Sequence, residues 1–154
     1  MPDPSQNVRT DRIDPERKLI MDTKELGIFG EEHAALYLKD LGYQIIARNY
    51  RSRYGEIDII AADSEFTVFV EVKTRKYGVD NPIEPRAASS VTPEKQRRII
   101  KAAKTYLAYN PTDKKVRFDV IEVYYDTEGA KRRVREINHL EGAFDLNTAK
   151  GHRK

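Results

Sequence analysis

The 154-residue sequence contains no cysteine, which excludes disulfides, thiolate nucleophiles, cysteine-ligated zinc sites and iron–sulfur clusters. We therefore expect a reducing compartment, the cytoplasm. No apolar stretch approaches the roughly 18 residues that a transmembrane helix requires. The first 24 residues also lack the apolar segment of a secretory signal peptide, so we expect no secretion by that route. The sequence shows no internal repeat and no glycine-rich phosphate-binding loop.

The composition is that of a single globular domain with a heavily charged surface. Hydrophobic residues make up 39% of the chain and charged residues 34%, and the mean hydropathy is −0.72. Lys and Arg number 28 against 25 Asp and Glu, a net charge of +3. This excess is too small to indicate nucleic-acid binding by itself, so the position of the positive charge along the chain is more informative.

The two ends of the chain differ from its middle. Residues 1–24 contain no aromatic residue, three prolines, and five acidic residues balanced by five basic ones. Such a segment buries too little apolar surface to offset its loss of conformational entropy, so we predict a disordered N-terminal arm. Residues 25–144 carry the periodic patterns of one domain, and residues 145–154 resemble a flexible basic tail.

Apolar periodicity predicts the order helix, three strands, helix, two strands. The predicted helices are 25–41 and 92–109, and the predicted strands are 43–50, 56–62, 66–74, 116–125 and 131–140. Short turns between the first three strands favour an antiparallel meander. The predicted fold class is therefore α/β, with a mixed β-sheet flanked by helices.

One carboxylate of the first predicted helix lies on its apolar arc. At about 100° per residue, Glu31 falls between Leu38 and Ala35, on the side that would face the sheet. Glu32 falls on the polar arc beside Lys39. We therefore predict that Glu31 points toward the sheet, where it needs a partner because burying an unpaired charge is costly.

Charged residues also interrupt two apolar strands. Asp58 lies within the strand 56–62, and Glu71 and Lys73 lie within the strand 66–74. One interpretation is an ion-pair cluster in which Lys73 neutralises an acid at a solvated sheet edge. The other is a cation site, because clustered carboxylates repel one another and hard oxygen ligands favour Mg²⁺ or Mn²⁺. A lysine beside such a site can orient water or stabilise charge on a phosphate under attack.

Asp58, the interval of thirteen positions to Glu71, and the sequence Glu71-Val72-Lys73 resemble the motif of the PD-(D/E)xK nucleases. The proline that precedes the aspartate in many members is absent here. The nearest likeness is the bacterial YraN-like family, which is similar to archaeal Holliday-junction resolvases. The likeness begins at 27–31 and includes the segments 48–50, 55–61, 69–75 and 117–120.

This resemblance implies a restriction-endonuclease-like core and a metal-dependent endonuclease that acts on DNA, with branched or otherwise structured DNA as a candidate substrate. It implies Asp58 and Glu71 as ligands of Mg²⁺ or Mn²⁺ and Lys73 as the catalytic lysine. Glu31 matches the helix acid that completes the resolvase site and would be a third ligand. Asp119 matches the family pattern, but we expect it to pair with an arginine. Because resolvases cut two strands with two subunits, the resemblance also implies a homodimer.

The predicted helix 92–109 concentrates positive charge, with five basic residues against one acidic residue. Next to a site that cuts phosphodiesters, its cationic stripe would follow the nucleic-acid backbone. Similar nucleases often carry a residue near the start of this helix that contacts the substrate or orders the site. The candidate nucleic-acid-binding residues are Lys95, Gln96, Arg97, Lys101 and Lys104.

Other interpretations fit the same residues. The basic helix could present only a solvated face, and the whole chain could be a non-catalytic nucleic-acid-binding protein that keeps the nuclease fold. An RNA-directed nuclease would carry the same motif. The acid–acid–lysine set favours an enzyme, because binding alone does not require it.

Overall fold

The computed structural model describes residues 15–79 and 91–146. Its element order confirms the predicted one. The elements are α1 (Pro15–Asp40), β1 (Gln44–Arg51), β2 (Glu56–Ala62), β3 (Phe66–Lys76), α2 (Pro93–Tyr109), β4 (Lys115–Glu128) and β5 (Lys131–Phe144). Within the described ranges, neither helix is long and apolar enough to cross a membrane.

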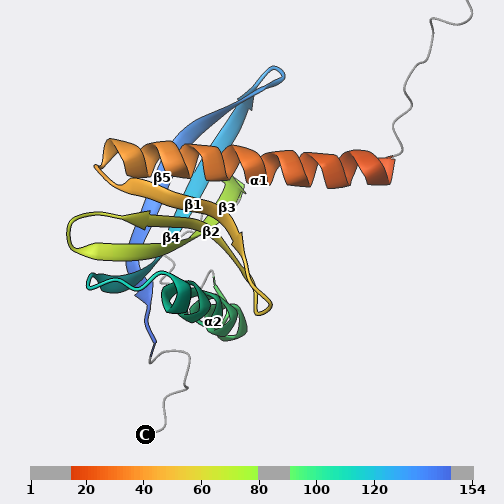
Figure 1. Ribbon diagram of the computed structural model, residues 1–154. Coiled ribbons are helices and arrows are strands. Elements are labelled where there is room, and N and C mark those ends of the chain that lie inside the picture. Colours follow the sequence, from red (N-terminus) through yellow and green to blue (C-terminus); the bar gives the residue numbers. More distant parts are fainter. Residues whose placement is uncertain (1–14, 80–90, 147–154) are drawn as a thin grey trace, which may run out of the picture.

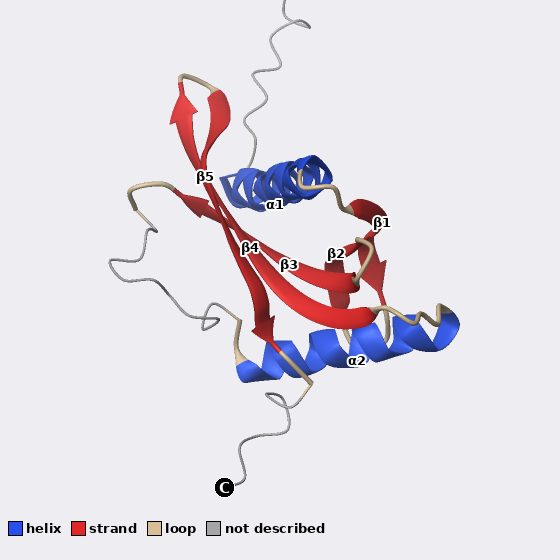
Figure 2. Ribbon diagram, turned by 90° about the vertical axis from the view of Figure 1, so that its left-hand side faces the viewer, coloured by secondary structure: helices blue, strands red, loops and turns tan. Residues whose placement is uncertain are grey.

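The strands form one mixed five-stranded sheet in the order β1-β2-β3-β4-β5. β1, β2 and β3 pair antiparallel, which confirms the predicted meander, and β4 and β5 also pair antiparallel. β3 and β4 pair parallel, with α2 between them in the chain. α1 lies on one face of the sheet and α2 on the other (Figures 1 and 2). The predicted α/β class is confirmed.

Each helix packs on its own apolar layer. Leu38 of α1 packs with Val70 of β3, whereas Ile99 of α2 packs with Phe69. Because side chains along a strand alternate between the two faces, Phe69 and Glu71 lie on the α2 side of the sheet. Glu71 therefore follows directly after the apolar layer that α2 covers.

α1 begins at Pro15, ten residues before the predicted start at Glu25, so the predicted disordered arm is wrong for residues 15–24. Proline suits the first turn of a helix because its fixed φ and missing N–H cost nothing there. The next residues are mostly good helix formers, and the number of apolar residues in a segment does not reflect this propensity. Residues 1–14 of the predicted arm and 147–154 of the predicted tail lie outside the described residues.

Candidate functional site

β2 and β3 stop pairing beside Asp58. The antiparallel register ends at Ile59↔Val70, although β3 continues to Lys76. Beyond that pair, the backbone N–H of Val72 donates to Asp58 Oδ2 at 2.8 Å. The Asp58 carboxylate thus takes the position of a strand partner at the point where the two strands separate.

Glu71 lies next to Asp58 and holds both lysines of the site. Its side chain is 5% exposed, and its Oε1 lies 2.5 Å from Lys95 Nζ and 3.6 Å from Lys73 Nζ. Thr92 Oγ1 accepts the backbone N–H of Lys95 at 3.2 Å. This N-cap of α2 therefore fixes the position of the Lys95 backbone. Across the described residues, the ion pairs of both lysines go to Glu71 and none goes to Asp58.

The charge of Glu71 opposes the ionisation of Asp58. Burial and the neighbouring charge of Glu71 raise the pKa of Asp58 from its ordinary value of 3.8 to about 8. The Val72 N–H lowers the pKa of Asp58, but not enough to cancel these two effects. With no cation between the carboxyl groups, Asp58 is mostly protonated at neutral pH. A bound cation would reverse this, because it favours both charged forms.

The two lysines respond differently to the same carboxylate. Burial lowers the pKa of Lys73, and the positive charge of Lys95 adds to this effect despite the opposing charge of Glu71. Burial also acts to lower the pKa of Lys95, but the hydrogen bond and the charge of Glu71, together with Lys73 and Asp58, outweigh it and leave that pKa raised. Lys73 is therefore the lysine that releases a proton more readily.

Glu31 approaches this pair from α1. It is half-buried while Glu32 is exposed, as the helical wheel predicts. Burial raises the pKa of Glu31, a hydrogen bond with Asn49 and the charge of Arg48 lower it, and the charge of Glu71 raises it. Although α1 covers the opposite face of the sheet, Glu31 thus interacts with the acid pair where β2 and β3 separate.

Asn49 is a functional candidate that the sequence analysis missed. Within the described residues it is the one non-glycine residue with a positive φ, 52°, a conformation that asparagine tolerates better than most residues. Its side chain hydrogen-bonds to Glu31. The signal for Asn49 in the sequence was its place in the segment 48–50 that carries the family resemblance.

Gly30 lets α1 approach β3 closely. A Cβ on Gly30 would overlap the hydroxyl of Thr74. We expect Gly30→Ala to lower the free energy of unfolding by about 1–3 kcal/mol, because the methyl group displaces α1 from β3. Thermal melts of Gly30→Ala, Thr74→Ala and the double variant measure this. The double variant should recover part of the loss, and no recovery would contradict the overlap with Thr74.

The predicted metal ligands do not converge as a set of three. Among residues 15–79 and 91–146, no group of three or more His, Cys, Asp or Glu side chains is arranged to hold a metal ion. Instead, Asp58 and Glu71 form a pair, Glu31 lies beside them, and the Lys95 ammonium contacts Glu71. Mg²⁺ commonly binds through one or two carboxylates and keeps several waters. The oxygen donors of the pair therefore fit this cation.

A cleft of about 310 Å³ opens onto the acid pair. Its lining includes Gly55, Glu56, Asp58, Glu71, Lys95 and Arg98. The cleft thus lies between the β1–β2 hairpin, the point where β2 and β3 separate, and the first turns of α2. A polar group that enters it reaches Asp58 and Glu71 directly.

The predicted nucleic-acid-binding residues separate into three groups. Arg97, Lys101 and Lys104 are exposed on α2, as the prediction requires, whereas Lys95 contacts Glu71. Gln96 is 7% exposed, and its Nε2 donates to the carbonyl of Val91 at 2.9 Å. A buried side chain cannot contact a polyanion, so the prediction for Gln96 is wrong. The sequence indicates the burial of Gln96, because positions 96, 99 and 103 lie on one face of the helix and Ile99 and Ala103 are core residues.

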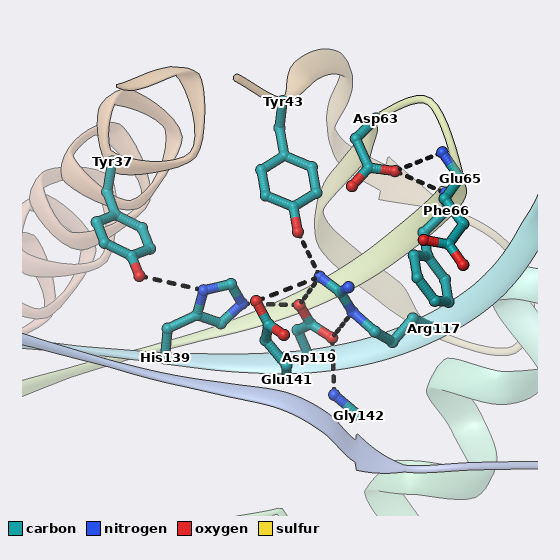
Figure 3. Close-up of polar contacts among 10 residues, drawn as sticks. All are labelled: Tyr37, Tyr43, Asp63, Glu65, Phe66, Arg117, Asp119, His139, Glu141 and Gly142. Carbon is teal, nitrogen blue, oxygen red and sulfur yellow. Dashed lines mark hydrogen bonds and ion pairs between the residues drawn. The ribbon is translucent and has the colours of Figure 1, made fainter. Parts of the chain in front are cut away.

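Asp119 pairs with an arginine, as predicted (Figure 3). Arg117 Nε and Nη2 donate to its two oxygens at 2.8 and 2.9 Å, and the backbone N–H of Gly142 donates at 3.0 Å. His139 Nε2 lies 2.7 Å from Asp119 Oδ2, and its Nδ1 lies 3.2 Å from the hydroxyl of Tyr37. This cluster links α1 to β4 and β5.

Comparisons with known proteins place this chain in a family. A family model described as "Uncharacterised protein family UPF0102" matches residues 30–123. A curated UPF0102 protein of Geotalea daltonii is 48% identical over 129 residues, which cover 81% of this chain and 93% of that protein. One of Mycolicibacterium vanbaalenii is 43% identical over 122 residues (77% and 92%), and one of Clostridium botulinum is 44% identical over 118 residues (75% and 93%). The chain therefore belongs to the UPF0102 family.

Proposed function

We propose that this protein is a Mg²⁺- or Mn²⁺-dependent nuclease of the PD-(D/E)xK type that hydrolyses phosphodiester bonds in DNA. The observation that carries the proposal is the pair of Asp58 and the buried Glu71 at the cleft, where the charge of Glu71 opposes the ionisation of Asp58. Such a pair stabilises a fold poorly, but it suits a site whose charge is completed by a bound cation.

The chain's own residues divide the chemistry among them. Asp58 and Glu71 would hold the divalent cation, which supplies Lewis-acid stabilisation of a phosphoryl oxygen and activation of water. Lys73 lies 3.6 Å from Glu71, where its amino group can orient a water or stabilise charge on the phosphate. Glu31, which hydrogen-bonds to Asn49, adds a third carboxyl group at the edge of the pair.

The proposal extends to compartment and assembly. The cytoplasm is the proposed compartment, because both DNA and Mg²⁺ are available there. A homodimer is the proposed assembly, on the resemblance to resolvases alone.

A panel of substrates tests the activity. Linear duplex, single-stranded and four-way-junction DNAs, with a matched RNA, are incubated with the protein and Mg²⁺, Mn²⁺ or a chelator. We expect cleavage with metal, none with chelator, and none by Asp58→Asn. Metal-independent binding with no cleavage of any substrate would instead favour a non-catalytic nucleic-acid-binding protein. Cleavage of the RNA alone would correct the substrate class.

The exposed cations of α2 carry a separate prediction about binding. Replacing Arg97, Lys101 and Lys104 with alanine should weaken DNA binding and reduce its salt dependence by up to about three phosphate contacts. Cleavage at saturating DNA should survive in part, because none of the three contacts the acid pair. The measurement is the slope of log affinity against log salt concentration.

The matched control removes three charges from the β4–β5 hairpin instead, by replacing Lys131, Arg132 and Arg133. They begin β5, and the β4–β5 hairpin lies far from α2 in the fold (Figure 2). If both triple variants change the slope equally, net charge explains the effect. If the α2 variant leaves the slope unchanged, the stripe is only a solvated face.

A further inference from the structure

Tyr54 has an exposed aromatic ring with two cationic side chains beside it. It lies in the turn between β1 and β2, and 40% of it is exposed. The Arg53 guanidinium lies 4.9 Å from its ring centroid, and Lys101 Nζ of α2 lies 5.8 Å from it. Proteins that bind single-stranded nucleic acid combine stacking rings with cations in this way, because the ring takes the base and the cations take the adjacent phosphates.

The turn that carries Tyr54 is held in place. Ser52 Oγ accepts the backbone N–H groups of Tyr54 at 3.1 Å and Gly55 at 3.3 Å, and the Ser52 N–H donates to the Gly55 carbonyl at 2.9 Å. The turn also packs on α2, since a Cβ on Gly55 would lie 3.3 Å from the Cβ of Arg98. A ring on a fixed turn loses little conformational entropy when a base stacks on it.

The position of Tyr54 connects the two functional surfaces. Its neighbour Gly55 lines the cleft that contains Asp58 and Glu71. Lys101, which lies against the ring, belongs to the exposed cationic stripe of α2. A strand that follows this stripe toward the acid pair therefore passes the ring of Tyr54.

We propose that Tyr54 is a stacking platform for an unpaired nucleobase and that it makes the protein select strands with unpaired nucleotides beside the cleft. This inference rests on the proposed function, because it takes the strand that enters the cleft as the substrate. In a duplex both faces of each base are already stacked, so a base must first be unstacked before it can reach the ring. An unpaired base has a free face and pays no such cost.

A tryptophan at position 54 reports stacking directly. The chain contains no tryptophan, so Tyr54→Trp introduces a single fluorophore. In chelator, where nothing is cleaved, we expect single-stranded oligonucleotide to quench its emission, and a duplex of the same sequence to quench it much less at equal occupancy. Matched DNA and RNA strands distinguish the two sources of unpaired base, and quenching by either supports the platform.

Tyr77 provides the matched control. It is also an exposed tyrosine, with Arg135 lying 5.0 Å from its ring centroid, but it follows β3 near the β4–β5 hairpin and does not line the cleft. Tyr77→Trp should therefore show little quenching. Equal quenching at positions 54 and 77 would mean that any exposed ring near an arginine responds, and it would overturn the proposal.

Affinity gives a second measurement. Tyr54→Ala should weaken single-strand binding by about 5- to 100-fold, the range of one base–aromatic stack, and leave duplex binding unchanged. Tyr54→Phe keeps the ring and should bind like the wild type. If single strands do not quench Tyr54→Trp and Tyr54→Ala binds them as tightly as the wild type, the stacking platform is overturned, even if the protein cuts DNA. Quenching and loss of affinity support it even if the protein cuts nothing, which would refute only the nuclease proposal.

Discussion

Asp58→Asn is expected to raise the melting temperature in chelator while it abolishes metal-dependent cleavage. Asparagine keeps an oxygen to accept the Val72 N–H and supplies an N–H to donate to Glu71. It therefore reproduces the hydrogen bonds of protonated Asp58 but cannot ionise. The lysines keep their partner, because both contact Glu71 rather than Asp58.

The gain in stability should depend on pH. The native pKa of Asp58 is about 8 against an ordinary value of 3.8, so the folded protein binds a proton more tightly than the unfolded chain. The associated stability is full below the unfolded pKa and is lost as the pH rises through about 8. Asp58→Asn has no such loss. We expect a gain of about 2–4 kcal/mol near pH 8, or roughly 4–16 °C, and almost none near pH 4.

Metal and a matched variant complete the test. Mg²⁺ or Mn²⁺ should raise the melting temperature of the wild type but not of Asp58→Asn, because ligand binding stabilises only a protein that retains its site. Glu71→Gln also removes one negative charge, but two ammonium groups lose their carboxylate, so its melting temperature should not rise. Strong destabilisation by Asp58→Asn, with no effect of metal on the wild type, would identify a structural cluster instead of a catalytic one.

The sequence predicted the acid pair because charges are conspicuous inside apolar strands. Asp58 and Glu71 could be paired from strand alternation and short turns alone, without knowledge of the helices. Glu31 was predictable for the same reason. A helix has 3.6 residues per turn, so its apolar face can be located from the sequence, and an acid on that face breaks the apolar pattern. These patterns are local in the sequence, so they can be recognised without knowledge of the tertiary structure.

The partners of these residues were less predictable, because they depend on how separate elements meet. Lys95 reaches Glu71 only because the β3–β4 crossover lays α2 across that face of the sheet, which periodicity does not specify. Asn49 reaches Glu31 through a positive φ within a strand, which no strand pattern predicts. The early start of α1 at Pro15 depends on helix propensity, which a count of apolar residues does not capture.

Asp119→Asn should cause the largest loss of stability. Asp119 is fully buried, and burial would raise its pKa, but hydrogen bonds from His139, Arg117 and the Gly142 N–H outweigh burial and lower it. Removing its charge leaves the guanidinium of Arg117, 13% exposed, without its main counter-ion. We expect a cost of about 3–5 kcal/mol, or a fall of roughly 6–20 °C in melting temperature.

An exposed pair of similar geometry is the control for this effect. Asp126 lies 2.7 Å from Arg133 Nε on the β4–β5 hairpin, but water screens both groups. Asp126→Asn should therefore leave the melting temperature almost unchanged. Equal effects of the two variants would show that burial adds nothing to the Asp119 pair.

The effect of Asp119→Asn should disappear in acid, which distinguishes it from Asp58→Asn. Because the native pKa of Asp119 lies below its ordinary value of 3.8, its stabilisation is present above that value and is lost as the pH falls through the native pKa. The two variants therefore move the melting temperature in opposite directions near pH 8 and converge on the wild type at low pH. Melting curves across this range measure both. A fall for Asp119→Asn that persists in strong acid would show that packing, and not the charge, is what the substitution removes.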